Sequence, residues 1–214
     1  MRDQQKVNQE IARSWRNAWG NENFRRKTII GSLLLFTIMA TMPYFFGIIE
    51  KRVGTRLNDH LLLLLPAFDV STITFLIIWS MTLFILFRGA QKPEIFIVAL
   101  YTLILLSLTR MLTIYLFPLN PPAGLIPLKD PLSSLFYGGP SVFVTKDLFF
   151  SGHTSAQFMI FLCLQGKKDK QVALMATILV AVLVLVQHVH YTIDVVAAFV
   201  FTYLINLLAR KIVL

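Results

Sequence analysis

The chain has 214 residues, of which 56% are apolar and only 14% are charged. Soluble domains carry about 25% charged residues, so this composition excludes an ordinary soluble domain and indicates a membrane protein. The formal net charge of +9 does not indicate nucleic-acid binding, because the basic residues lie between long apolar runs and are better explained as a topology signal. Cys163 is the single cysteine, which excludes an intrachain disulfide.

The first 27 residues are polar and basic. They lack the apolar core and cleavage site of a secretory signal, so we expect them to be retained. Four apolar residues recur there at four-residue intervals: Val7, Ile11, Trp15 and Trp19. This spacing is typical of an amphipathic helix on an anionic cytoplasmic leaflet, and a disordered basic tail is the alternative. We predict a cytoplasmic arm over residues 1–27 and a membrane domain over residues 28–214.

Six stretches are long enough, or nearly so, to cross a bilayer at about 20 residues each. They are Thr28–Ile49, Val70–Phe87, Ile95–Phe117, Phe149–Gln165, Gln171–Val189 and His190–Ala209. The fourth stretch is short. Leu57–Asp69 is too short to cross and is predicted as an interfacial helix that ends at Pro66. The sequence thus predicts an all-α integral membrane protein with six transmembrane helices.

The distribution of Lys and Arg predicts the orientation. With the N-terminus inside, fourteen of the 20 basic residues fall in cytoplasmic segments and five in outer ones. Positively charged loops stay in the cytoplasm, so both termini are predicted to be cytoplasmic. The long loop Pro118–Leu148 then faces outward, and it contains six of the nine prolines. Such a loop is either a lid over a functional site or an irregular connector.

Four ionisable residues from three predicted spans fall at a similar depth on the outer side. His153 begins the fourth span, and His190 and Asp194 begin the sixth. Arg110 lies seven residues before the end of the third span, about 10 Å below its outer end. Ionisable residues inside spans are expensive and usually mark a functional interior, so this convergence predicts the active site.

These residue types suit displacement at a phosphate ester. His190 and Asp194 are four residues apart, so on a helix they share a face, and the carboxylate can orient the imidazole as nucleophile or base. His153 can protonate a leaving group. The guanidinium of Arg110 matches two phosphate oxygens.

Structural explanations exist for the same residues. Ser151 could simply cap a helix that starts at "SGHT", and a His–Asp pair in a bundle is often structural. The sequence "HVH" (His188 to His190) could suggest a metal, but these side chains diverge on a helix and no further Cys or His completes a set. We predict no metal site. His188 and His60 are expected to have no catalytic role.

Two motifs resemble those of sphingomyelin synthases, within the superfamily of type-2 phosphatidic acid phosphatases (PAP2). They are "DLFFSGHT" (Asp147–Thr154) and "HYTIDVV" (His190–Val196). "RMLTIYLFPL" (Arg110–Leu119) and "LPAFDVS" (Leu65–Ser71) are similar to two looser synthase motifs. The resemblance implies a six-span PAP2-like bundle with an outward or lumenal site, in agreement with the topology predicted from charge.

The resemblance also implies roles for individual residues. His153, His190 and Asp194 would form the catalytic triad. The expected substrate-binding residues are Arg110, Asp147, Ser151, Gly152, Thr154 and Tyr191. Synthases move phosphocholine or phosphoethanolamine from a glycerophospholipid to ceramide or a similar lipid alcohol, release diacylglycerol, and use no metal or other cofactor. The partners would be the two lipids and the membrane; the sequence does not define an oligomeric state.

Departures from the hydrolytic branch of the superfamily favour the synthase-like branch. The hydrolytic branch has a proline before "SGH" and an arginine six residues before the final histidine, whereas this chain has Phe150 and Val184 at these positions. The chain also lacks the cysteine that often opens the synthase motif, and has Thr145 and Lys146 before Asp147. A headgroup transferase is therefore the leading hypothesis. A lipid phosphatase that uses the same triad is the alternative, and a transporter or structural protein is the third.

Overall fold

The computed structural model describes residues 2–129 and 144–214. Residues 130–143, which include the "GGP" of the predicted outer loop, lie outside the described residues. The described part contains seven α-helices, one 3₁₀ turn (η1, Leu62–Leu64) and no strand. The helices are α1 (Arg2–Gly20), α2 (Glu22–Ile49), α3 (Ser71–Gln91), α4 (Pro93–Leu116), α6 (Gly152–Cys163), α7 (Lys167–Val186) and α8 (Thr192–Val213). The predicted all-α class is confirmed for these residues.

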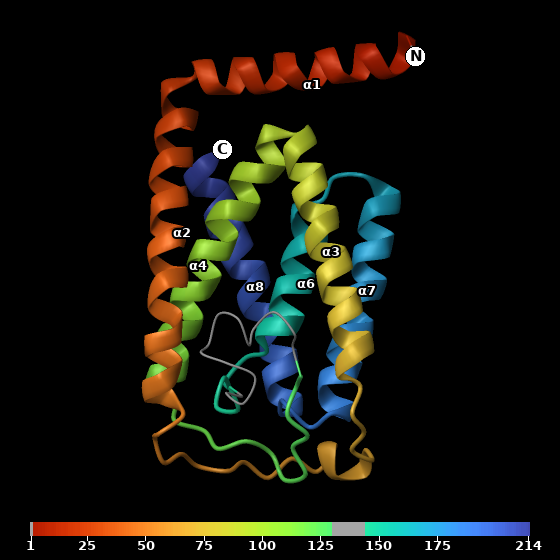
Figure 1. The fold of residues 1–214 in the computed structure, drawn as a ribbon. Coiled ribbons are helices and arrows are strands. Elements are labelled where there is room, and N and C mark those ends of the chain that lie inside the picture. Colours follow the sequence, from red (N-terminus) through yellow and green to blue (C-terminus); the bar gives the residue numbers. More distant parts are fainter. Residues whose placement is uncertain (1, 130–143) are drawn as a thin grey trace.

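The N-terminal arm is helical, as its apolar spacing predicts. Figure 1 shows α1 lying across one end of the bundle, nearly perpendicular to α2. Asn21 lies between the two helices. Its side chain accepts the Phe24 N–H at 3.1 Å and so caps the start of α2. The Trp15 indole donates to the Ala90 carbonyl at 2.7 Å and packs edge-on against Phe24 and Phe96. The predicted boundary at residue 27 falls inside α2.

Within residues 2–129 and 144–214, five helices are long and apolar enough to cross a membrane: α2, α3, α4, α7 and α8. The fourth predicted span, Phe149–Gln165, is not confirmed as one. Its helix, α6, has 12 residues and is about 18 Å long, against a hydrocarbon core of about 30 Å. Residues 144–151 enter the bundle as irregular backbone, and Figure 1 shows α6 beginning part-way along it. This arrangement places the start of α6 inside the bundle.

Helix α4 occupies the centre and packs against α2, α3, α6 and α8. Its buried face includes Ile97, Val98 and Ile104, whereas the outward faces of the bundle carry exposed large apolar side chains such as Phe36, which is 73% exposed. Buried alanines let helices approach closely, among them Ala198 on α8 and Ala173 on α7. An apolar exterior around a close-packed core fits a bundle surrounded by lipid.

Polar contacts close the end of the bundle where both termini lie (Figure 1). Arg88 of α3 pairs with Asp169 of α7 at 2.8 Å, and Lys92 donates to Gln165 at 3.0 Å. Arg210 of α8 donates to the Leu162 carbonyl at the end of α6 at 2.8 Å. These contacts join the basic segments that the charge distribution assigns to the cytoplasm.

The opposite end consists of irregular segments that pair with one another. The Thr55 N–H donates to the Pro118 carbonyl and the Asn120 N–H to the Thr55 carbonyl, both at 2.9 Å. The predicted interfacial helix Leu57–Asp69 is wrong except for the single turn η1. Asp59 explains the difference, because its carboxylate accepts N–H groups from both Leu62 and Thr192 and so ties this segment to α8.

We expect the two ends to be labelled from opposite sides of the membrane. Val53, 90% exposed in the irregular end, and Lys168, in the first turn of α7, are the positions to change to Cys. A membrane-impermeant maleimide should label Val53→Cys in intact cells and Lys168→Cys only after permeabilisation. The parent protein is the control, because its one cysteine, Cys163, is buried. Labelling of both positions without permeabilisation would contradict the predicted topology.

Candidate active site

Ser151 starts α6 and ties it to α8. The Ser151 side chain accepts the Thr154 N–H at 3.3 Å, which is the expected N-cap bond. The Ser151 N–H donates to the backbone carbonyl of Asp194 at 3.0 Å. The capping role weighed for "SGHT" is therefore present. It does not compete with a chemical role for His153, which is the second residue of the helix.

His190 and Asp194 meet, but not on one helix. α8 begins at Thr192, so His190 lies in the preceding turn and the predicted helical i, i+4 geometry is wrong. The contact arises because Asp194 reaches back past the helix start. Its Oδ2 lies 3.4 Å from His190 Nδ1 and accepts the Tyr191 N–H at 3.1 Å. Both side chains are buried, with His190 3% and Asp194 0% exposed.

His153 faces His190 across the start of α6. The two imidazole rings lie 6.3 Å apart between centroids, at an interplanar angle of 61°. Phe75 of α3 packs edge-on against the His153 ring at 5.9 Å. Two histidines from different segments thus flank one small region, with Asp194 behind the second.

Arg110 lies directly over the N-terminus of α6. Its guanidinium forms an ion pair with Asp147 and lies 5.7 Å from the centre of the Phe150 ring. A Cβ at Gly152 would overlap with Arg110 Nη1, so only glycine leaves room for the guanidinium at this position. The sequence predicted that Arg110 lies at the same depth in the membrane as the histidines. The structure places its guanidinium against Gly152, between Ser151 and His153.

Burial and the neighbouring Arg110 act on the pKa of Asp147 in opposite directions. Burial by itself would raise the pKa of the Asp147 carboxyl. The neighbouring Arg110 charge and hydrogen bond outweigh burial, with smaller contributions from His190 and His153, so the pKa lies below its usual range. Asp147 is therefore an anion that holds the guanidinium in place.

Glu50 positions the segment that carries Asp147, and sequence reasoning did not identify it. Its carboxylate accepts the N–H groups of Thr145 and Lys146 at 2.6 and 2.7 Å and the Thr145 hydroxyl at 2.8 Å. Glu50 immediately follows α2, so the first span delivers this carboxylate to the active-site segment. The one sequence feature that could have pointed to Glu50 is its position as an acidic residue at the predicted outer end of a span.

Three other predicted substrate-binding residues have structural contacts. Ser151 and Thr154 are fully buried at the start of α6. The Tyr191 hydroxyl donates to the Asn120 carbonyl at 2.8 Å and accepts the Leu57 N–H at 3.1 Å. Tyr191 thus holds the two irregular segments together beside His190. Its expected contact with substrate stays a prediction, as do those of Ser151 and Thr154.

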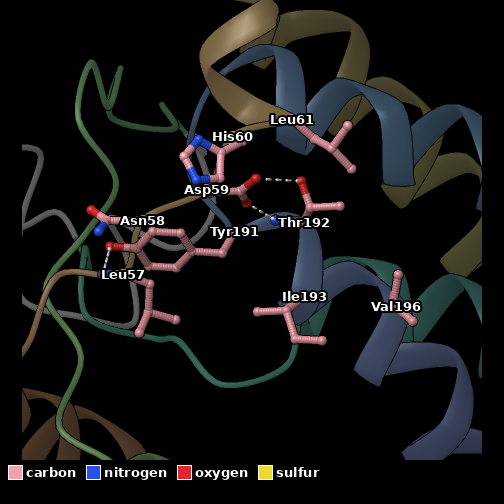
Figure 2. Close-up of a pocket in the computed structure, with 9 residues that line it drawn as sticks. All are labelled: Leu57, Asn58, Asp59, His60, Leu61, Tyr191, Thr192, Ile193 and Val196. Carbon is pink, nitrogen blue, oxygen red and sulfur yellow. Dashed lines mark hydrogen bonds between the residues drawn. The ribbon is translucent and has the colours of Figure 1, made fainter.

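Tyr191 also lines a cavity of about 520 Å³ (Figure 2). It is lined by Leu57, Asn58, Asp59, His60, Leu61, Tyr191, Thr192, Ile193 and Val196. Figure 2 shows the Asp59 carboxylate bonded to the backbone and hydroxyl of Thr192 at the start of α8. Neither His153 nor His190 lines this cavity, so we do not take it as the centre of the chemistry.

The prediction that His188 has no catalytic role stays a prediction, but the structure shows that its ring has two close contacts. His188 Nδ1 lies 3.0 Å from the Ala123 carbonyl oxygen and Nε2 lies 3.0 Å from that of Leu65. His188 and Phe149 are the non-glycine residues with positive φ in the described part of the chain, at 55° and 104°. Each precedes a site residue by two positions, and such strain costs on the order of 1 kcal/mol or more.

The "HVH" sequence does not bring its histidines to one point. His188 contacts the Ala123 and Leu65 carbonyls, whereas His190 contacts Asp194. Among residues 2–129 and 144–214, no three His, Cys, Asp or Glu side chains are grouped to hold a metal ion. We therefore assign no metal ligands.

Comparison with known proteins gives a family match for the C-terminal part of the chain. No curated protein and no solved structure matches the chain. Residues 146–211 match the family model described as PAP2 superfamily C-terminal. The matched segment runs from just before α6 almost to the end of α8 and contains His153, His190 and Asp194. Over these residues the chain is similar to the PAP2 superfamily, whose members are generally phosphatases or phosphotransferases.

Proposed function

We propose that this protein is a membrane lipid headgroup transferase. It moves phosphocholine or phosphoethanolamine from a glycerophospholipid to ceramide or a similar lipid alcohol and releases diacylglycerol. The observation that carries the proposal is the group formed by half-buried His153 and buried His190 and Asp194, beside the guanidinium of Arg110. The PAP2 match supports a lipid phosphatase or phosphotransferase, and the synthase-like motifs favour transfer.

His190 acts as nucleophile or as base in this proposal. Asp194 Oδ2 faces Nδ1, which keeps the proton on that nitrogen and leaves Nε2 with its lone pair. Nε2 then attacks phosphorus to form a phosphohistidine, or removes the proton of the acceptor hydroxyl for direct transfer. In both routes Asp194 stabilises the imidazolium that forms.

His153 protonates the departing diacylglycerol oxygen. An attacking atom lies about 3–3.5 Å from its target and a proton donor about 3 Å from the leaving oxygen. The two rings, 6.3 Å apart between centroids, flank the region in which the P–O bond would lie. In the phosphohistidine route, the P–O bond to diacylglycerol breaks as the P–N bond forms, and His153 afterwards takes the proton of the acceptor hydroxyl.

Arg110 and the start of α6 form the phosphate site. A helix N-terminus carries partial positive charge, and Arg110 lies against the first residue of α6, Gly152. Asp147 accepts from Arg110 Nη2 and keeps the guanidinium oriented, and Nη1, beside Gly152, would bind a phosphate oxygen. Arg110 and Asp147 are partly buried, with 16% and 23% of their side chains exposed, so these charges act more strongly on the transition state than they would in water.

Burial of His190 and Asp194 supports transfer over hydrolysis. His190 is 3% exposed, and the irregular segments from Glu50 to Val70 and from Pro118 to Lys129 pack beside it. A transferase must keep water away while a lipid hydroxyl enters. The phosphatase alternative uses the same residues with water as acceptor, so product analysis has to separate the two.

The same proposal places the site on the outer or lumenal face, with both termini in the cytoplasm. The supporting observation is that α8, which begins two residues after His190, starts at the irregular end of the bundle, opposite α1 and the C-terminus (Figure 1). On the cytoplasmic face, α1 would then rest on the leaflet with Val7 and Trp19, both exposed, in contact with lipid.

Product analysis tests the proposed function. Purified protein in lipid nanodiscs receives headgroup-labelled phosphatidylcholine or phosphatidylethanolamine together with ceramide, and separately labelled phosphatidic acid. We expect a new labelled sphingolipid and an equal amount of diacylglycerol. Release of water-soluble label from phosphatidic acid alone would establish the phosphatase instead. The absence of any lipid product would refute both enzymatic assignments.

The triad should be intolerant of isosteric change. His153→Asn should lower kcat by about 10²–10⁴-fold because a positioned acid is lost. His190→Asn should be at least as damaging, and Asp194→Asn should also be severe because tautomer control is lost. The double variant His153→Asn/His190→Asn should lose far less than the product of the single effects, because residues that act as a unit are non-additive.

His60→Asn is the control for the triad variants, because His60 is an exposed histidine outside the triad. It should be nearly silent at matched protein level. If His153→Asn were as mild as His60→Asn, His153 would be no more than a residue next to a helix cap.

Gly152→Ala and Arg110→Lys test the phosphate site from its two sides. The added Cβ of Gly152→Ala would displace the guanidinium, and Arg110→Lys keeps the charge but loses the planar fork. Both should lower kcat/KM by at least about 10-fold with near-normal expression. Gly47→Ala is a matched control in α2, since a Cβ there meets no atom within 4 Å. Full activity of Arg110→Lys would show that Arg110 only balances Asp147.

A further inference from the structure

The turn that delivers His190 has an unusual residue at its key position. α7 ends in a Schellman motif, in which the His188 N–H donates to the Leu185 carbonyl and the Val189 N–H to the Val184 carbonyl. His188 occupies the left-handed position of this motif, at a φ of 55°. Glycine or asparagine normally fills it, because other side chains are strained there. A histidine therefore needs a compensating role for its side chain.

The ring of His188 has two acceptors and no donor. Nδ1 lies 3.0 Å from the Ala123 carbonyl oxygen and Nε2 lies 3.0 Å from the Leu65 carbonyl oxygen. A carbonyl can only accept, so both contacts are hydrogen bonds only when both ring nitrogens carry protons. The side chain is 7% exposed, and the Cα of Gly124, with a φ of 77°, leaves room for Nδ1.

No acidic group competes for this ring in the described part of the chain. The charged and titratable groups of the surrounding segments have other partners or are exposed: Arg56 donates to Pro121, Asp59 accepts from Thr192, Asp69 pairs with Lys129, His190 contacts Asp194, and His60 is exposed. The partial negative charges of the two carbonyl oxygens are therefore what faces the ring.

The preceding residue reinforces the same junction. Gln187 is fully buried; its amide nitrogen donates to Ser71 Oγ at 2.7 Å, and its amide oxygen accepts the Val70 N–H at 3.2 Å. Its backbone carbonyl accepts the Ile126 N–H at 3.1 Å. Gln187 and His188 thus both join the end of α7 to the same two irregular segments, and His190 follows two residues later.

We propose that His188 is a positioning residue, which donates from both ring nitrogens to the Leu65 and Ala123 carbonyls and so fixes the turn that presents His190. These two hydrogen bonds, which we call the clamp, are both present only while both ring nitrogens carry protons. One of its two bonds is lost when the ring releases a proton at higher pH. This role rests on the proposed function only in its effect on catalysis, whereas the clamp itself can be measured without any substrate.

His188→Gly separates the clamp from the backbone turn. If the side chain had no role, glycine would relieve the strained φ and leave the protein as stable or more stable. We expect the opposite at about pH 6, namely a lower Tm than wild type, with a smaller difference at about pH 8.5, because two donors require a proton on each ring nitrogen. Contributions of the other histidines are common to both proteins and cancel in the difference.

His188→Asn and His60→Gly complete the experiment. Asparagine tolerates the left-handed conformation, so His188→Asn should lower kcat by about 10–100-fold through misplacement of His190, with little change in KM. The exposed control His60→Gly should change neither Tm nor kcat. A Tm of His188→Gly equal to or above that of wild type at about pH 6, or a loss independent of pH, would overturn the clamp. An unchanged kcat in both His188 variants would overturn the positioning role.

Failure of the clamp and failure of the proposed function give different results. If wild-type protein formed no lipid product, the enzymatic assignment would be refuted. The comparison of Tm values would still decide whether His188 forms the clamp. A pH-independent Tm difference in an active enzyme would refute the clamp alone.

Discussion

The hydrogen bond from the Ser151 N–H to the Asp194 carbonyl joins the starts of α6 and α8, and the candidate site depends on this junction. It sets the N-cap of one helix against the first turn of the other. His153 lies two residues beyond the donor, and the side chain of the acceptor residue contacts His190. Because both residues are fully buried, the bond forms away from water, where an unpaired backbone group is costly. Any shift of one helix relative to the other would separate the two imidazoles.

Irregular backbone next to this junction needs partners of its own, and buried or half-buried side chains provide them. Glu50 accepts from the segment that leads into α6, Asp59 from the start of α8, and Gln187 and His188 bond to the segments beside α3 and after α4. In a bundle surrounded by lipid, backbone that leaves a helix is tolerated only where protein groups satisfy it. The same side chains that meet this requirement therefore also fix the geometry around His190.

The short α6 has a consequence for where the chemistry lies. A helix of 12 residues that ends at the basic end of the bundle cannot reach the other surface, so its N-terminus and Arg110 lie inside the bundle rather than at its edge. Charged groups at such a depth are costly unless paired, and Arg110 is paired with Asp147. A lipid headgroup that replaced part of this pairing would meet a preformed cationic site with little reorganisation, which is the condition for strong electrostatic stabilisation.

The sequence by itself determined the class of protein, the helical arm, five of the spans and the convergence of Arg110, His153, His190 and Asp194 on one region. These follow from apolar run length, residue periodicity and the cost of burying charge, all of which are local in the chain. Only the tertiary structure decided that His190 precedes its helix, that α6 is too short to span, and that Glu50, Gln187 and His188 support the site. Those contacts join residues far apart in sequence through backbone carbonyls and N–H groups. Every residue carries such groups, so the amino-acid sequence contains no pattern that identifies which of them will be paired.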